Sequence, residues 1–153
     1  MMDNAIVVQT ADFEMQILYQ QLRQANTADG AIVTFTGLVR DFNQKSQVSG
    51  LFLEHYPAMT EKALHDIVHE ARQRWELGRV SILHRVGQLA PGEQIVFVGV
   101  TSSHRQNAFA ACEFIMDYLK TRAPFWKKEI TNQGDSWVSV KQQDKVAADK
   151  WDQ

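Results

Sequence analysis

The sequence predicts a mixed α+β fold in a single domain spanning residues 1–153. Three observations lead to this prediction. Short apolar runs with strand character, such as IVFV at 95–98, alternate with longer segments of helical spacing. The length of 153 residues suffices for one hydrophobic core. No repeat, low-complexity tract or linker divides the chain.

In the first half, Val33 and Phe35 are expected on one face of a strand, with Thr34 and Arg40 on the other. A polar stretch, DFNQKSQVS, follows this strand and is expected to form a loop. Two segments have helical spacing, and the second is expected to begin near Pro57. The expected elements are strands at 5–8, 31–40 and 51–56, helices at 12–25 and 57–78 with Gly78 as terminator, and a loop at 41–49.

The second half begins with RVSILHRVG, which alternates as a strand and is followed by the turn APGE. The run QIVFVGVTS is apolar enough for a strand buried on both faces. Ser103 and Gln106 have capping-box spacing, which predicts a helix that ends at Arg122 before Ala123-Pro124. FWKKEI and SWVSV flank TNQGD as a hairpin, and DKVAADKW predicts a last helix.

Composition limits the classes of function. The net charge is −2 and the pI is about 6.2, which argues against a protein that coats nucleic acid or an anionic membrane. The lone Cys112 cannot form an internal disulfide. The N-terminus lacks a basic region, and no apolar run is long enough to span a membrane. A cytoplasmic location is therefore expected, and any anion site must be a local group of cations.

His104 and Arg105 fall in the first turn of the long predicted helix. Cations are unfavourable there, because the helix dipole already places partial positive charge at this end. Free backbone N–H groups point outward from the same turn. A bound anion such as a phosphate would account for both side chains. The alternative is that both side chains extend into water.

The stretch YLKTRAPFWKKE gathers four cations among aromatic residues where that helix ends and a strand begins. Lys120 in the last helical turn is favoured by the helix dipole and needs no other explanation. Alternation along the strand places Lys127 beside Glu129 and next to Phe125. Apolar neighbours lower a lysine pKa toward the range where the amine exchanges protons. Each lysine taken singly is also compatible with a solvated surface position.

Three further features of the sequence are candidates for a functional role. Arg40 ends a strand and could hold a carboxylate or phosphate, although the pattern taken alone favours an ordinary surface arginine. Cys112 lies on the apolar stripe of its helix, so an inert buried thiol is favoured. His65 and His69 stand four residues apart but lie off the apolar stripe, which favours a solvated face over a metal site.

Long stretches of the chain resemble the large, catalytic subunit of molybdopterin synthase. The resemblance covers about residues 30–138, and these segments carry it: GAIVTFTGLVRD, LEHYPAMTEKAL, GRVSILHRVGQLAPGE, VFVGVTSSHRQNAFAACEFIMDYLKTRAPFWKKE and GDSWV. It implies a fold of the α/β-hammerhead kind with additional antiparallel strands.

The resemblance also implies a reaction and its partners. Two large subunits form a central dimer, and each binds a small ubiquitin-like sulfur carrier that ends in a Gly-Gly thiocarboxylate. Two sulfurs pass from carriers to cyclic pyranopterin monophosphate, which yields the dithiolene of molybdopterin. No metal or cofactor is expected, because molybdenum enters later and sulfur arrives on the partner. The anionic substrate and tail would account for a cationic pocket.

Family pocket residues are carried over position by position. Lys120 is expected nearest the carrier's terminal carbonyl as the acid–base or nucleophilic group, and Lys127 is expected to stabilise developing charge. The expected substrate-binding residues are Arg40, His104, Arg105, Phe35, Glu129 and Lys141. Trp137 and Trp151 are expected either at the partner interface or in ordinary packing.

Two rival functions remain open at this point. A non-catalytic module that senses a phosphorylated metabolite would use the same cations without a carrier partner. The segment KTRAPFWKK also has the mixture of basic and aromatic residues that grips single-stranded RNA. The RNA hypothesis requires steeply salt-dependent binding and lacks a wider basic field.

Overall fold

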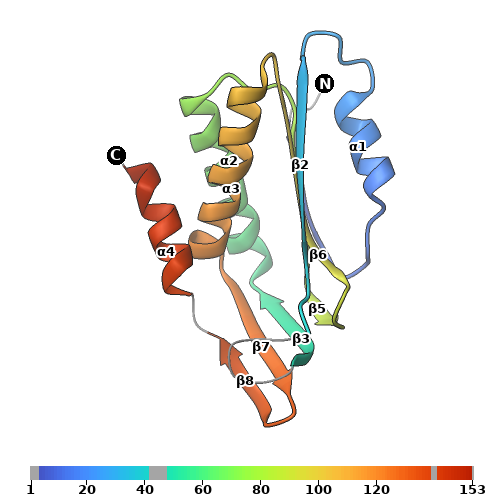
Figure 1. Cartoon of the computed structure of the whole chain (residues 1–153), viewed down its shortest axis with the longest axis vertical. Helices are drawn as coiled ribbons and strands as arrows, with labels where there is room; N and C mark the ends of the chain where they lie inside the picture. Colours follow the sequence, from blue (N-terminus) through green and yellow to red (C-terminus); the bar gives the residue numbers. More distant parts are fainter. Residues whose placement is uncertain (1–3, 42–47, 139–140, 153) are drawn as a thin grey trace.

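The computed structural model describes residues 4–41, 48–138 and 141–152, and it contains two four-stranded sheets with helices around the first (Figure 1). The strands are β1 (Asn4–Gln9), β2 (Ala31–Leu38), β3 (Val48–His55), β4 (Val80–Arg85), β5 (Gly87–Leu89), β6 (Gln94–Ser102), β7 (Phe125–Thr131) and β8 (Gly134–Val138). The helices are α1 (Met15–Arg23), α2 (Pro57–Arg74), α3 (Arg105–Arg122), α4 (Gln142–Asp149) and a terminal 3-10 turn (Lys150–Asp152). The mixed α+β class is confirmed.

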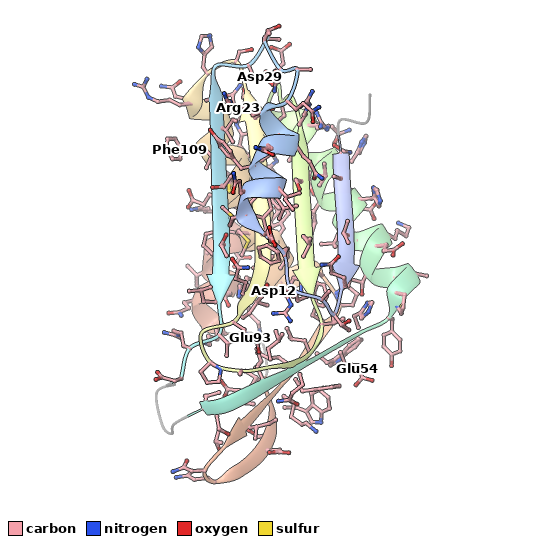
Figure 2. All side chains as sticks on the ribbon, turned by 90° about the vertical axis from the view of Figure 1, so that its right-hand side faces the viewer. Asp12, Arg23, Asp29, Glu54, Glu93 and Phe109 are labelled. Atoms are coloured by element: carbon pink, nitrogen blue, oxygen red, sulfur yellow. The ribbon has the colours of Figure 1, made fainter. Side chains whose placement is uncertain are left out.

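The first sheet has the order β1-β4-β6-β2, with β1 and β4 parallel and the other pairs antiparallel. Helix α1 covers one face, and α2 and α3 cover the other (Figures 1 and 2). Phe97 of β6 packs edge-to-face against Phe13 under α1. Val98 and Val100 of the same strand belong to the cluster beneath α2 and α3. The two central strands are therefore buried on both faces, which matches the apolar composition predicted for β6.

The second sheet is antiparallel throughout, in the order β5-β3-β7-β8. It lies beyond the lower end of the first sheet (Figure 1). A separate apolar cluster joins the two sheets, and its buried members are Val39, Leu51, Leu53, Val86 and Leu89. The C-terminal end of α3 leads directly into β7 at this junction, so residues from both sheets meet there.

Helix α3 ends at Arg122, as predicted, because Ala123 adopts an extended conformation before Pro124. Its start was predicted wrongly. His104 is the N-cap residue, no side chain caps the helix, and the proposed capping box of Ser103 and Gln106 is not formed. His104 and Arg105 are both exposed at this end.

The segment RVSILHRVG was predicted as one alternating strand, and the structure corrects this prediction. β4 and β5 belong to different sheets, and Gly87 at the start of β5 has a φ of +91° that favours glycine. All six residues of β4 are buried, because helices cover both faces of its sheet. The sequence could not show this, since burial on the second face depends on distant helices.

Two element boundaries also differ from the predictions. Residues 42–47 of the predicted loop lie outside the described residues, but Val48 and Ser49 already belong to β3. Helix α2 ends at Arg74, so Gly78 is not its terminator. A Cβ at Gly78 would lie 2.0 Å from Asp29 Oδ2 and 2.5 Å from Thr101 Oγ1, so close packing requires glycine there.

The C-terminal segment packs on α3 through α4 and the terminal turn. The Trp151 indole N–H donates a 2.7 Å hydrogen bond to Asp117 Oδ2, and the ring contacts Trp75 and Phe114 edge-to-face. Trp151 therefore serves packing within the chain. Trp137 is 57% exposed on the second sheet. No helix in the described ranges is long and apolar enough to cross a membrane.

Candidate functional site

A cavity of about 130 Å³ lies at the junction of the two sheets, beside the C-terminal end of α3. Lys120 of α3, Lys127 of β7 and Lys141 just before α4 all contribute to its wall. The other lining residues are mostly apolar: Phe35, Gly37, Leu38, Leu51, Leu53, His84, Ile95, Val96, Leu119, Ala123, Phe125, Val138 and Asp144. The chain thus forms a largely aliphatic pocket with lysine ammonium groups around it.

Lys127 is half-buried in β7, where it pairs with Leu53 of β3 and Val138 of β8. Burial, together with the positive charges of Lys120 and Lys141, lowers the pKa of Lys127 to about 8. Glu129 acts in the opposite direction, as the alternation along the strand predicted. At neutral pH Lys127 is therefore mostly charged but can exchange its proton readily.

Lys120 stands on the last turn of α3 and remains accessible to solvent, although protein surrounds part of its side chain. This partial burial lowers the pKa of Lys120, and the nearby charges of Lys141 and Arg40 act in the same direction. The Asp144 carboxylate raises this pKa and so opposes them.

The other two cations of the 118–129 stretch point elsewhere. Arg122 lies 3.7 Å above the Tyr118 ring and pairs with Glu70 at 3.2 Å. Lys128 lies on the opposite face of β7 from Lys127, over the rings of Phe52 and Trp137. The basic and aromatic stretch is therefore divided among three surroundings, so it does not form the continuous patch that the RNA hypothesis needs.

Phe35, Arg40 and Glu129 have different relations to the cavity. Phe35 lines it and is 42% exposed. Arg40 follows β2 and is close enough for its charge to act on Lys120. Glu129 is half-buried and acts on Lys127 through its charge. These three residues therefore belong to the surroundings of the lysine pair.

His104 and Arg105 are the exception to the predicted grouping. Both were expected in one pocket with Lys120, but they lie at the opposite end of α3. Fifteen helical steps separate Arg105 from Lys120, which corresponds to about 22 Å along the axis. Within a single chain the structure therefore does not bring these two residues to the cavity.

The sequence interpretation missed two pocket residues, His84 and Asp144. His84 is only 5% exposed at the end of β4, and Asp144 lies in the first turn of α4. Neither periodicity nor a motif in the sequence links His84 to the lysines. Only the tertiary arrangement places these residues beside Lys120 and Lys127.

The other sequence candidates lie outside this site. Cys112 is buried at 5% exposure, and burial raises the pKa of its thiol to about 12, so the thiol is unreactive near neutral pH. His65 and His69 are exposed on α2, as the off-stripe position predicted. Within residues 4–41, 48–138 and 141–152, no group of three metal-ligating side chains is brought together.

Comparison with known proteins gives consistent results. The family model described as "MoaE protein" matches residues 8–122. The chain is 56% identical over 151 residues to "Molybdopterin synthase catalytic subunit" of Escherichia coli strain K12, covering 99% of this chain and 100% of that protein. The protein of the same name from Pseudomonas aeruginosa is 57% identical over 149 residues, covering 97% and 99%.

Solved structures agree in fold. "Molybdopterin biosynthesis MoaE protein" from Burkholderia ambifaria superimposes with a TM-score of 0.84 at 49% identity, covering 98% of this chain and 99% of that one. Molybdopterin synthase from Staphylococcus aureus gives a TM-score of 0.79 at 33% identity, covering 91% and 98%.

Proposed function

This chain belongs to the MoaE family of molybdopterin synthase catalytic subunits, and from that premise we propose that its lysine-lined cavity transfers sulfur from a carrier protein to a pterin substrate. The carrier is a small ubiquitin-like subunit whose Gly-Gly C-terminus bears a thiocarboxylate. The acceptor is cyclic pyranopterin monophosphate, and two transfers yield the dithiolene. A cytoplasmic location fits this role.

The cavity suits a glycine tail that carries a negative charge. Its walls are mainly aliphatic side chains, and glycine methylenes pack against such walls without needing polar partners. Lys120, Lys127 and Lys141 supply cations at the cavity. In a partly dehydrated site these cations attract a terminal carboxylate or thiocarboxylate more strongly than they would in water.

In each transfer a new carbon–sulfur bond forms on the substrate while a carbon–oxygen bond at the same substrate carbon breaks, and that oxygen leaves as water or stays on the phosphate as the cyclic ester opens. The carrier's bond between its acyl carbon and sulfur is hydrolysed: the oxygen of a water molecule replaces sulfur on the acyl carbon, and the carrier is released as a carboxylate. Lys120, with a lowered pKa and access to solvent, donates and accepts the proton at the carrier carbonyl. Lys127 in its ammonium form stabilises the negative charge that develops on the carbonyl oxygen. Phe35 and Glu129 complete the surroundings of the reacting groups.

The substrate phosphate needs cations that a single chain does not gather at the cavity. Arg40 and Lys141 act on Lys120 through their charges and supply part of this requirement. His104 and Arg105 lie about 22 Å away along their own α3. Their exposed helix N-terminus is suited to a phosphate, and the family role implies a dimer of large subunits. We therefore place each chain's His104 and Arg105 at the cavity of the other chain in that dimer.

The single observation that carries this proposal is the convergence of Lys120 and Lys127 from separate elements on one cavity. The test is a single-turnover assay with thiocarboxylated carrier and cyclic pyranopterin monophosphate. Lys120→Ala should lower the rate of dithiolene formation roughly 100-fold or more. Lys62→Ala is the matched control, because Lys62 is an exposed lysine paired with Asp66 on α2.

The control should keep the wild-type rate, and both variants should still bind the carrier. Equal rates in wild type and Lys120→Ala would remove Lys120 from the chemistry. Tight binding of the phosphorylated pterin, with no product despite an active carrier, would support the metabolite-sensing module instead.

A further inference from the structure

His84 occupies the wall of the cavity, yet the proposed chemistry gives it no role. His84 is the second-to-last residue of β4. It is only 5% exposed, but it still lines the cavity. The charges of Lys120 and Lys127 both act on it, so it lies near the two lysines. A buried polar side chain at this position is expected to have a hydrogen-bonding function.

The His84 ring is held in one orientation. Its Nδ1 lies 2.8 Å from the backbone oxygen of Arg85. Because a carbonyl oxygen can only accept, Nδ1 carries the proton and donates it. The ring also stacks on Phe125, with 3.8 Å between centroids and 15° between planes. Both contacts hold the imidazole against rotation.

This orientation makes Nε2 a hydrogen-bond acceptor. Burial, with smaller contributions from the charges of Lys120 and Lys127, lowers the pKa of His84 to about 3, so the ring is neutral at physiological pH. With the proton on Nδ1, the lone pair resides on Nε2. The structure gives Nε2 no hydrogen bond among the described residues.

Nε2 is also not fully enclosed by protein atoms. Some buried or half-buried residues could have side-chain nitrogen or oxygen atoms that are enclosed by protein and lack a hydrogen-bond partner. In the described part of the chain, His55 Nδ1 is the only such atom. Since Nε2 of His84 is unpaired as well, it is not enclosed by protein atoms. Because His84 is almost fully buried and lines the cavity, the cavity is the open space from which a ligand can reach this free acceptor.

The polar groups of the cavity are mostly of one type. The lysines only donate hydrogen bonds, which suits the carbonyl oxygens and terminal charge of a glycine tail. Each peptide N–H of such a tail needs an acceptor when it leaves water, because an unmade hydrogen bond weakens binding. Among the lining side chains, His84 and the Asp144 carboxylate can accept. The Asp144 carboxylate already interacts with Lys120, whose pKa it raises. His84 is therefore the neutral acceptor among these side chains.

We propose that His84 Nε2 accepts a hydrogen bond from the peptide N–H of the carrier's last glycine and so fixes the terminal carbonyl between Lys120 and Lys127. This inference rests on the proposed function, because it assumes a glycine-ended carrier. His84 is thus a tail-binding residue. It positions the reacting carbonyl without exchanging a proton.

The test compares two semisynthetic carriers. One ends in Gly-Gly, and in the other the last glycine is replaced by glycolic acid, so an ester oxygen replaces the N–H without added bulk. The ester carrier should bind the wild-type chain about tenfold more weakly, as expected for one lost hydrogen bond with a buried acceptor. His84→Phe should bind the amide carrier correspondingly more weakly and should no longer distinguish the two carriers.

Two further variants separate binding from folding. His84→Gln retains an acceptor near the position of Nε2 and should restore part of the preference for the amide carrier. His55→Phe is the matched control, because His55 lies 6.2 Å from the same Phe125 ring but does not line the cavity. It should keep the full preference. Thermal unfolding of each variant reports whether the fold is intact.

His84→Phe should mainly lower the affinity for the carrier. The single-turnover rate at saturating carrier should change less. Equal affinities of the wild-type chain for the amide and ester carriers, with product still formed, would overturn this inference alone. So would an unchanged preference in folded His84→Phe. A wild-type chain that binds neither carrier and makes no product would remove the proposed function as well.

Discussion

Lys127 is a cation in a position that disfavours its charged form, because burial and neighbouring positive charges lower its pKa. Its place in β7 was predictable from alternation, because Phe125, Lys127 and Glu129 share a face. The partner strands and the opposing Lys120 come from segments far away in sequence. The sequence could therefore indicate that the pKa is lowered, while its value depends on the fold.

The pH dependence of sulfur transfer follows from this pKa. Lys127 acts as an ammonium, and the ammonium fraction falls as pH rises through about 8. The single-turnover rate should therefore decline on the alkaline side near pH 8. Lys127→Arg should move this decline to higher pH, because a guanidinium stays protonated. An alkaline limb that stays at the same pH in the arginine variant would contradict the role of Lys127.

Cys112 is the residue for which we predict no functional effect. Its thiol is buried and its pKa is raised to about 12, so it supplies no thiolate near neutral pH. Cys112→Ala should keep the wild-type rate of dithiolene formation. Its free energy of unfolding should fall by about 1 kcal/mol from the small cavity created. A folded but inactive Cys112→Ala would mean that the chain's own sulfur takes part.

Among the elements, α4 contributes to the cavity wall at its start and is held on α3 by residues beyond its end. Lys141 and Asp144 at its start line the cavity, whereas Trp151 just beyond its end holds the segment on α3. Trp151→Ala should reduce the free energy of unfolding by about 2–3 kcal/mol in chemical denaturation. It should also slow sulfur transfer, because the wall that carries Lys141 loses its attachment.

Trp137→Ala is the control for this prediction, because Trp137 is largely exposed on the second sheet. Its effect on unfolding should be much smaller. An equal loss of stability in both variants would contradict the packing role assigned to Trp151.

The elements themselves were largely predictable where a local signal marks them. Pro124 fixes the end of α3, and the apolar run of β6 reflects burial on both faces. The division of RVSILHRVG between two sheets was not predictable, since it depends on which strands lie beside each part. His84 and Asp144 were not predictable as pocket residues for the same reason. Each lies in an element whose sequence contains no local motif that indicates a function.

At the scale of the whole molecule, α3 spans the distance between two halves of the predicted site. Lys120 lies at the cavity, and Arg105 lies about 22 Å away along the axis. A helix of this length cannot bring its two ends to one pocket in the same chain. The family resemblance indicates candidate residue types but does not indicate which chain supplies them.

Mixing two inactive variants tests the shared site. In a dimer of Lys120→Ala with Arg105→Ala, one of the two cavities has both intact residues if the site is shared. Random subunit exchange should therefore restore about a quarter of wild-type active sites, measured as single-turnover amplitude. Each variant alone should stay slow. No recovery after verified exchange would show that Arg105 does not act across the dimer.

The proposed function requires that carrier sulfur enters the product at this cavity. The most direct measurement is a single turnover with carrier labelled by a heavy sulfur isotope, followed by mass spectrometry of the pterin and of the carrier. Wild-type chain should give a dithiolene with both sulfurs labelled and two carriers converted to carboxylates, whereas Lys120→Ala should give little of either. Unlabelled dithiolene, or labelled product formed equally fast by the Lys120→Ala variant, would contradict the account.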